Sequence, residues 1–400
     1  MDRSAEMNSA PRPSPRISDT TLRDSAHMPG VDFTPADGVA IAGLLRAVGV
    51  DLVEAGIVST GDRADLPLLG AVLDHVGPDH VLTLVLARNR KQVREDLELA
   101  RSLGCRAVMV SLPSSPVHAR LKLGTDRPER ILALARGVIG ISKEMGLHTT
   151  FSAEDGARTD PGFLAEYVAN GAAAGADRFR LAETVSTLRP DDTRRLAEVA
   201  VRAGAGIEVE IHSHNMLGLA VANALAAVDG GASWISTTVG GLGERGGNTP
   251  LAEVLTCLWR FHGVDRFDLT KLTTLTQEVE RRSAVPLGAT CGPTARFSYN
   301  YEIAGQWTHP EAFEAVPADL VGNQRRVRVR GRLRPALLRA CLPPDLTGGL
   351  DLDEFVEDVL NHLPAGKATL DETALRSLAL DFLARSTRPT VTTANERGAQ

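Results

Sequence analysis

The stretch Gly206-Ile-Glu-Val-Glu-Ile-His-Ser-His-Asn215 is an alternating apolar and acidic run that ends in two histidines. Alternation with a period of two predicts a β-strand over 207–214, in which side chains two apart point to the same side. His212 and His214 therefore project together from the carboxyl end of that strand. Two converging neutral imidazoles suit a divalent cation, although an isolated pair would as readily form local hydrogen bonds.

Short β-like runs alternate with amphipathic helical runs along the chain on both sides of this strand. The predicted strands cover 16–23, 51–58, 81–88, 106–112, 148–154, 178–184, 207–214 and 233–239. The predicted helices cover 35–48, 63–76, 91–103, 128–145, 162–174, 190–203, 217–228 and 251–262. Eight β-α pairs in about 250 residues predict an α/β fold, the (β/α)8 TIM barrel. A doubly wound sheet would need a glycine-rich phosphate turn after its first strand, and Thr20-Thr-Leu-Arg-Asp24 is not one.

The length of 400 residues accommodates one large domain and a smaller one. We expect a disordered N-terminal segment over 1–15, a TIM-barrel catalytic domain over 16–265, and a disordered tail over 387–400. Between the barrel and the tail, residues 266–386 are expected to form an appended, mostly helical C-terminal region involved in dimerisation. Its predicted helices cover 270–282, 350–363 and 372–384.

Composition excludes several classes of protein. The formal net charge of -6 provides no broad basic surface, so nucleic acid is not an expected partner. No run of eighteen apolar residues is present, so no membrane span is expected, and the N-terminus has no hydrophobic signal core. The four cysteines are far apart and form no Cys-x-x-Cys pair, which is typical of free thiols in a reducing cytoplasm.

Polar and charged residues gather at the carboxyl ends of the predicted strands, where barrel enzymes carry their active sites. A charge inside a barrel is costly unless it is paired or binds a ligand, so charges at one end of several strands indicate a site. Besides the two histidines, these residues are Arg23, Asp24, Glu54, Arg88, Thr150, Ser152, Glu154, Thr184 and the glycine-rich loop 240–248.

Asp24 with His212 and His214 would form a two-histidine, one-carboxylate site for a divalent cation such as Mn²⁺, Mg²⁺, Co²⁺ or Zn²⁺. Its open positions would accept the neighbouring oxygens of a 2-oxo acid, whose ketone the cation would polarise. Arg23 would stabilise the alkoxide that forms there, or would be a structural partner of Glu54.

Three further features have both a chemical and a structural interpretation. Glu154 would take part in proton transfer or would order the base, or it would cap the following helix. Thr184 would bind a substrate carboxylate, or would be an ordinary strand-end hydrogen bonder. The glycines of the loop 240–248 would let the backbone approach a ligand closely.

Six motifs in order resemble those of the DRE-TIM metallolyases, within the branch of homocitrate synthase and isopropylmalate synthase. They are Asp19-Thr-Thr-Leu-Arg-Asp24, Glu54-Ala-Gly56, Phe151-Ser-Ala-Glu-Asp155, Glu183-Thr-Val185, His212-Ser-His-Asn215 and Gly241-Leu-Gly-Glu-Arg-Gly-Gly-Asn248. The resemblance covers the barrel and continues weakly into 310–326.

The resemblance implies a Claisen condensation, in which acetyl-CoA is the co-substrate and adds to a 2-oxo acid beside the metal. It implies metal ligation by Asp24, His212 and His214, catalysis by Arg23 and Glu154, and 2-oxo acid binding by Thr184. It also implies a homodimer in which the C-terminal region of one chain reaches over the barrel of the other. The acyl-CoA loop would comprise Gly241, Gly243, Glu244, Arg245 and Asn248, with Asn248 close to the metal.

The chain departs from the pattern of that branch at positions that would touch substrate. His27 stands where a glutamine is usual, and Thr150 stands where homocitrate synthases place an arginine for the distal carboxylate. Met216 replaces an aspartate. A catalytic Ser-Gly-Ile-His segment is absent, and the alternatives near its place are Tyr299, Tyr301, Glu302 and His309.

These departures indicate a short anionic 2-oxo acid of the oxaloacetate, phosphonopyruvate or phosphinopyruvate type, as in the phosphonomethylmalate and phosphinomethylmalate synthases of phosphonate antibiotic pathways. His27 and Arg88 would pair with its oxyanion, while Glu54, Thr150, Ser152 and Thr184 complete the expected substrate-binding set. The alternatives are a homocitrate or isopropylmalate synthase proper, an aldolase or lyase of the same superfamily, and a barrel that has lost catalysis.

Overall fold

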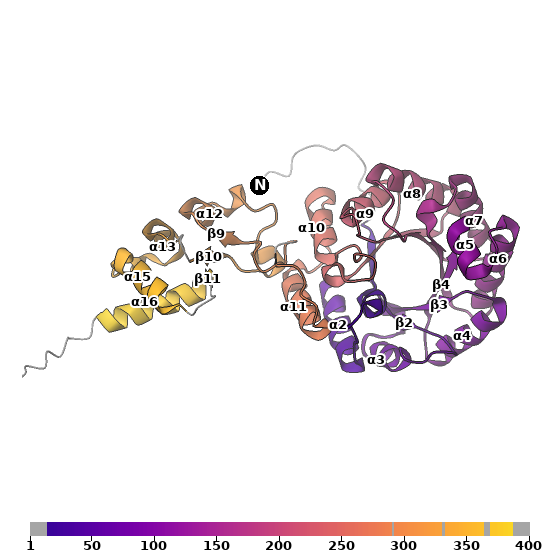
Figure 1. Ribbon diagram of the computed structural model, residues 1–400, viewed down its shortest axis with the longest axis horizontal. Helices are drawn as coiled ribbons and strands as arrows, with labels where there is room; N and C mark the ends of the chain where they lie inside the picture. Colours follow the sequence, from indigo (N-terminus) through magenta and orange to yellow (C-terminus); the bar gives the residue numbers. More distant parts are fainter. Residues whose placement is uncertain (1–13, 290–291, 330–332, 364–368, 387–400) are drawn as a thin grey trace, which may run out of the picture. The chain divides into compact units, whose positions relative to one another are not determined.

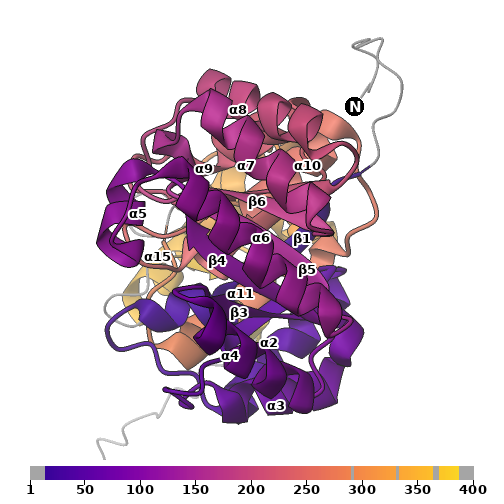
Figure 2. The ribbon, with the colours of Figure 1, turned by 90° about the vertical axis from the view of Figure 1, so that its right-hand side faces the viewer.

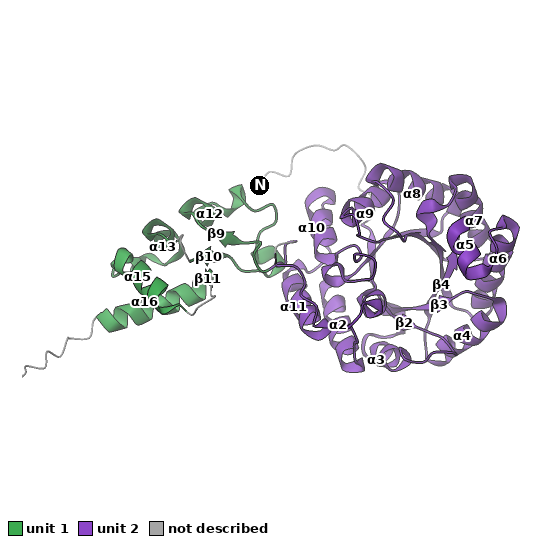
Figure 3. Cartoon of the chain, viewed as in Figure 1, with its two compact units in different colours: residues 1–3, 296–400 green, residues 4–295 purple. Residues whose placement is uncertain are grey.

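The computed structural model describes residues 14–289, 292–329, 333–363 and 369–386. The chain forms two compact units, residues 4–295 and residues 296–400 together with 1–3 (Figure 3). The disorder predicted for 1–15 and 387–400 therefore concerns segments that, apart from residues 14 and 15, lie outside the described residues. The first unit extends past residue 265, where the sequence placed the end of the barrel domain.

Eight parallel strands close into a barrel in sequential order, with β1 paired to both β2 and β8. This confirms the predicted TIM barrel, seen in Figure 1 as a ring of strands inside a ring of helices. The strands are β1 Arg16–Asp19, β2 Leu52–Ile57, β3 Val81–Leu86, β4 Ala107–Pro113, β5 His148–Glu154, β6 Arg178–Glu183, β7 Glu208–Ser213 and β8 Trp234–Thr237.

Helices cover the outside of the barrel, and Figure 2 shows α6 and α7 lying side by side across it. They are α2 Pro35–Val48, α3 Leu66–Val76, α4 Arg90–Ser102, α5 Pro116–Leu123, α6 Pro128–Glu144, α7 Pro161–Ala173, α8 Pro190–Gly204, α9 Ala220–Asp229, α10 Leu251–His262 and α11 Leu272–Ser283. Local sequence explains their boundaries: α2, for example, begins with a Thr34–Asp37 capping box and Pro35, and ends at Gly49 with φ 101°.

The first strand is shorter than predicted. The sequence placed it over 16–23, but β1 ends at Asp19, and the one-turn helix α1 Thr21–Asp24 follows. The side chain of Asp19 accepts a hydrogen bond from the backbone N–H of Thr21, which ends the strand and starts the turn. Arg23 and Asp24 therefore reach the barrel mouth from a helical turn.

The barrel interior has an apolar part and an ionic part. Leu52, Leu82, Leu84, Ala107, Met109 and Trp234 form a buried apolar cluster. On β6 and β7, Arg178, Arg180 and Glu210 are buried instead, and Phe179 and Val209 alternate with them on the opposite face. Both faces of a parallel barrel strand are buried, one against the helices and one inside the barrel. Here the apolar residues face the helices, and the charged residues face the barrel interior.

The C-terminal unit contains helices around a small sheet. Its helices are α12 Ala304–Thr308, α13 Pro335–Cys341, α14 Pro344–Thr347, α15 Leu352–His362 and α16 Glu372–Ser386, and its strands are β9 Asn300–Tyr301, β10 Arg326–Arg328 and β11 Thr369–Asp371. The two long helices match the sequence prediction, whereas the three-stranded sheet was not foreseen. Phe355, Leu338 and Val327 are among the residues of its own buried core.

Two further observations bear on the sequence predictions. Among the described residues, no helix is both long enough and apolar enough to cross a bilayer. Cys105, Cys257 and Cys341 are free thiols. Cys291 lies outside the described residues.

Candidate metal centre and active site

Asp24, His212 and His214 converge at the mouth of the barrel. One candidate ligand atom from each side chain lies within 4.8 Å of the others, and all three residues are buried. The two imidazole rings are 5.1 Å apart and nearly perpendicular, as expected for side chains two residues apart that face one point. The juxtaposition predicted from the sequence is therefore present in the structure.

The protonation states of these three groups suit a metal. Burial alone would raise the pKa of Asp24, but the neighbouring guanidinium of Arg23 acts against it, and this pKa lies well below the ordinary value. Burial lowers the pKa of His212 well below the ordinary histidine value and also lowers the pKa of His214. A carboxylate and two neutral imidazoles are the ligand forms that a divalent cation requires.

Hydrogen bonds orient the ligand atoms. Nδ1 of His214 lies 3.1 Å from the carbonyl oxygen of Gly247, so this nitrogen carries the proton and Nε2 keeps its lone pair. A guanidinium N–H of Arg245 lies 2.8 Å from Nε2 of His214, so Nε2 accepts this hydrogen bond and carries no proton. Nδ2 of Asn248 donates to Oδ2 of Asp24 at 2.5 Å, as the resemblance implied for a residue close to the metal.

Arg23 links the candidate metal centre to the ionic interior of the barrel. Its Nε donates to Glu54 at 2.6 Å, and its Nη1 pairs with Asp24. Glu54 in turn pairs with Arg180 at 2.7 Å. Glu54, predicted to bind substrate, is fully buried beneath Arg23, so it can position Arg23 but does not line the pocket.

A cavity of about 410 Å³ opens above the three candidate ligands. Of the residues expected to hold substrate, it is lined by His27, Ser152 and Thr184. The hydroxyl oxygen of Thr184 accepts the backbone N–H of Asp155 at 2.9 Å, which leaves its own O–H to donate into the cavity. Glu244 and Arg245 of the glycine-rich loop also line it.

Glu154 is at the mouth with two partners that the sequence analysis missed. Oε1 of Glu154 lies 2.6 Å from Nδ1 of His118 and 2.6 Å from Nζ of Lys122, and all three residues line the cavity. Both partners come from α5, a short helix in the loop after β4. The signal was readable: Ser115-Pro116 begins a helix, and residues 118 and 122 share one face at i, i+4.

His27 and Arg88 line an adjoining cavity of about 540 Å³, which Arg23 also lines. The pair of side chains predicted to receive an anionic group is therefore brought together beside the candidate metal centre. The same cavity contains Asp62 and Asp96. Asp96 is already engaged by the backbone N–H of Thr60 at 2.6 Å.

The remaining predicted residues lie outside the mouth cavity. Thr150 is fully buried one layer below Ser152, and its hydroxyl has no hydrogen-bond partner among the described residues. Gly241 and Gly243 shape the loop. Gly243 has φ 151°, and a Cβ there would meet Nδ2 of Asn248 at 2.0 Å, so a side chain at this position would displace the hydrogen bond to Asp24.

Comparison with known proteins agrees with this site. The model of the HMGL-like family matches residues 14–279. The chain belongs to the HMGL-like family. It is 35% identical over 313 residues to the homocitrate synthase of Sulfurisphaera tokodaii, a match that covers 77% of this chain and 67% of that protein. It is 33% identical over the same length and coverage to the homocitrate synthase of Saccharolobus solfataricus.

These relatives place this HMGL-like chain in the branch of homocitrate and isopropylmalate synthases and identify it as an acyltransferase of the condensing type. Among solved structures, the HMG-CoA lyase of Brucella melitensis superposes with a TM-score of 0.58 at 19% identity, covering 68% of this chain and 99% of that one. The HMG-CoA lyase of Pseudomonas aeruginosa has the same TM-score at 20% identity, covering 67% and 92%. At such identities the likeness shows the fold alone.

Proposed function

We propose that the protein condenses acetyl-CoA with a short anionic 2-oxo acid of the oxaloacetate, phosphonopyruvate or phosphinopyruvate type, giving a malate-type product and CoA. The observation that carries the proposal is the convergence of Asp24, His212 and His214 within 4.8 Å, beneath a cavity that Arg23, His27 and Thr184 also line. The similarity to homocitrate synthases supports the choice of acetyl-CoA as acyl donor.

A divalent cation held by Asp24, His212 and His214 would supply Lewis-acid polarisation of the ketone. The chain's own residues account for the remaining needs of the reaction. The hydroxyl of Thr184 lines the cavity and can donate its O–H to the carboxylate beside the ketone. Arg23, at the border of both cavities, offers a cationic group to the oxygen on which negative charge develops.

Proton abstraction from the methyl group of acetyl-CoA is assigned to His118. Its Nδ1 is hydrogen-bonded to Glu154, which fixes the ring and stabilises the charge that the ring gains, and the pair lies at the mouth where a bulky acyl-CoA would enter. Glu154 then acts as the residue that orders the base, one of the two roles expected from the sequence.

The bonds change in two steps. The methyl carbon transfers its proton to the base and forms a C–C bond with the ketone carbon, whose carbonyl electron pair moves to oxygen as an alkoxide beside Arg23. The protonated base returns its proton to the alkoxide. Water then adds its hydroxyl to the thioester carbonyl carbon, the C–S bond breaks, and CoA leaves as the thiol with a proton from that water. This second step makes thiol release a measure of condensation.

The choice of a short anionic acid depends on three positions. Arg88 and His27 line one cavity beside the metal centre and would receive the distal phosphonate, phosphinate or carboxylate. Thr150 is fully buried and carries no charge, whereas binding the distal carboxylate of a longer dicarboxylate would need an arginine at this position. Homocitrate synthesis is the second candidate function, because homocitrate synthases at 33–35% identity are among the relatives.

Thiol release from acetyl-CoA, followed with a panel of 2-oxo acids and added Mn²⁺, tests the proposal. We expect oxaloacetate or phosphonopyruvate to give the highest kcat/KM, with 2-oxoglutarate and 2-oxoisovalerate at least tenfold lower. A preference for 2-oxoglutarate would favour homocitrate synthesis. If no acid of the panel supports thiol release and the protein instead cleaves a hydroxy acid, the lyase alternative is favoured.

The metal ligands are tested with a matched pair of variants. We expect His212→Ala to lose both bound metal, measured by elemental analysis, and thiol release. His80→Ala, which changes a histidine at the other end of the barrel, just before β3, is the control and should retain both. Normal metal content in His212→Ala would contradict the assignment. The homodimer and the cytoplasmic location expected from the sequence remain proposals.

A further inference from the structure

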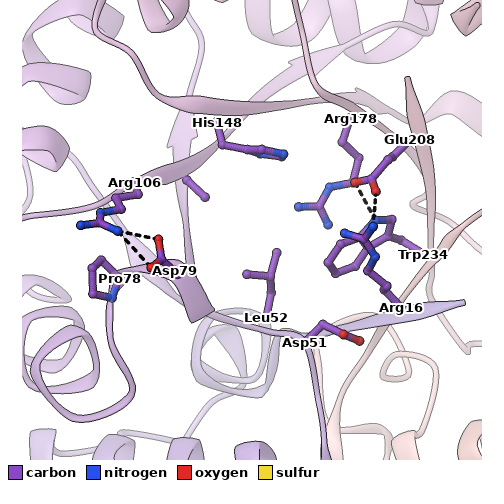
Figure 4. Close-up of a pocket in the computed structure, with 11 residues that line it drawn as sticks. Arg16, Asp51, Leu52, Pro78, Asp79, Arg106, His148, Arg178, Glu208 and Trp234 are labelled. Atoms are coloured by element: carbon purple, nitrogen blue, oxygen red, sulfur yellow. Dashed lines mark hydrogen bonds and ion pairs between the residues drawn. The ribbon is translucent and has the colours of Figure 1, made fainter. Parts of the chain in front are cut away.

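A further cavity lies at the opposite end of the barrel from the metal centre (Figure 4). Its volume is about 470 Å³, and seven of its eleven lining residues are the first residues of barrel strands, among them His148 and Arg178. Because the strands are parallel, these residues mark the amino-terminal end. The Claisen chemistry proposed above does not use this end.

Arg178 is the residue that singles this cavity out. It is 0% exposed, yet its Nε and Nη2 have no hydrogen-bond partner in the part of the chain that the structure describes. Its remaining Nη1 lies 3.4 Å from Glu210, a carboxylate that Arg180 engages at 2.9 Å. Buried N–H groups of a guanidinium are rarely left without an acceptor, because the loss of water is then not offset.

The acidic residues at this end already have partners. Glu208 accepts from the indole N–H of Trp234 at 2.8 Å and pairs with Arg16 at 3.1 Å. The other two acids pair with arginines as well, Asp79 with Arg106 at 2.8 Å and Asp51 with Arg266 at 2.7 Å. Arg178, by contrast, pairs at 3.4 Å with a carboxylate that Arg180 also engages, so among the described lining residues its charge is weakly compensated.

The shape of the cavity favours an organic anion. Figure 4 shows the guanidinium of Arg178 and the ring of His148 pointing toward its middle. The guanidinium lies 3.9 Å over the ring of Trp234, which holds it in place. Leu52 and Pro78 provide apolar surface opposite these donors.

We propose that the amino-terminal end of the barrel carries a binding site for a small carboxylate. The two unpartnered N–H groups of Arg178 form the fork that a carboxylate matches, and His148 supplies a further donor. The apolar wall takes the short hydrocarbon body of the ligand. The site is separate from the metal centre and concerns a ligand other than the condensing substrates at the mouth.

Succinate titration of the full-length protein tests this site, with tryptophan fluorescence as the signal because Trp234 contacts Arg178. We expect saturable binding that Arg178→Gln weakens at least tenfold and His148→Leu at least threefold. Thr184→Val, at the barrel mouth, is the control and should change the Kd less than twofold. Phosphate, which has no hydrocarbon body, should bind at least tenfold more weakly than succinate.

Each contrary result would overturn the assignment. Failure to saturate by about 50 mM succinate would show that no useful affinity exists. Unchanged affinity in both Arg178→Gln and His148→Leu, or loss in Thr184→Val, would place the succinate elsewhere. Phosphate bound as tightly as succinate would exclude a carboxylate-selective site. If Arg178→Gln fails to fold, His148→Leu still decides, because His148 is exposed at the start of β5.

Discussion

Glu154 has two hydrogen-bonding partners, His118 and Lys122, and they can be separated by substitution. His118→Gln keeps a hydrogen-bond donor beside Glu154 but cannot accept a proton at neutral pH. We expect its kcat to fall by about 10²–10⁴ with a much smaller change in KM for the 2-oxo acid, as the loss of a general base does. Lys122→Met removes the other partner of the same carboxylate and should reduce kcat less than tenfold. If both variants lost the same factor in kcat, His118 would only help to hold Glu154 in place and would not be the general base.

The convergence of the three candidate metal ligands could be predicted, because it depends on spacing within short sequence motifs. His212 and His214 lie two apart on a strand, and Asp24 follows a strand that hydrogen-bonds to the far end of the barrel sequence. Once the barrel was inferred, closure placed all three at one end. Glu54 was predicted to bind substrate, and its burial and its ion pair with Arg180 could not be read from its local motif, because Arg180 is distant in sequence.

At the scale of single elements, α10 contains a carboxyl group in an unfavourable environment. Burial raises the pKa of Glu253 to about 7, from 4.5. Between pH 4.5 and about 7 the native state binds more protons than the unfolded chain. The free energy of unfolding therefore decreases as the pH rises through this range. Above about pH 7 the carboxylate is charged in both states, and its full destabilising effect is present. Glu253→Gln should therefore stabilise the protein at pH 8 by up to about 3 kcal/mol and have little effect at pH 4.5.

Urea unfolding at both pH values measures this difference. Glu98→Gln, at an exposed position on α4, is the control and should show no such pH dependence. A Glu253→Gln variant that is equally or less stable than the parent at pH 8 would show that the carboxylate has a stabilising partner.

The elements themselves were predictable to the extent that periodicity and caps decide them. The long helices and seven of the eight strands agree with their sequence patterns, whereas β1 ends early because the side chain of Asp19 accepts the backbone N–H of Thr21. The ionic interior of β6 and β7 was not foreseen. Alternation reveals two faces of a strand, but which face meets the barrel interior depends on closure by strands far away in sequence.

At the scale of the whole molecule, the proposed homodimer requires a contribution from the C-terminal unit. The sequence offered Tyr299, Tyr301, Glu302 and His309 as replacements for the missing histidine segment. The hydroxyl of Tyr299 donates to the carbonyl of Val316 at 2.9 Å, Tyr301 bonds to Glu314, and Glu302 pairs with Arg328. His309 is 69% exposed at its side chain, so it is the member of this set best placed to reach another chain.

Mixed dimers test this arrangement directly. If His309 acts in the active site of the partner, His309→Ala and His212→Ala should each have little activity alone. Mixing them by co-expression should restore thiol release, because one mixed active site combines an intact metal centre with an intact His309. With random pairing, half of the dimers are mixed and each has one working site, so about a quarter of the parental activity is expected. No recovery despite demonstrated mixed dimers would place His309 in its own chain's site or outside catalysis, since a residue acting within one chain cannot complement the other.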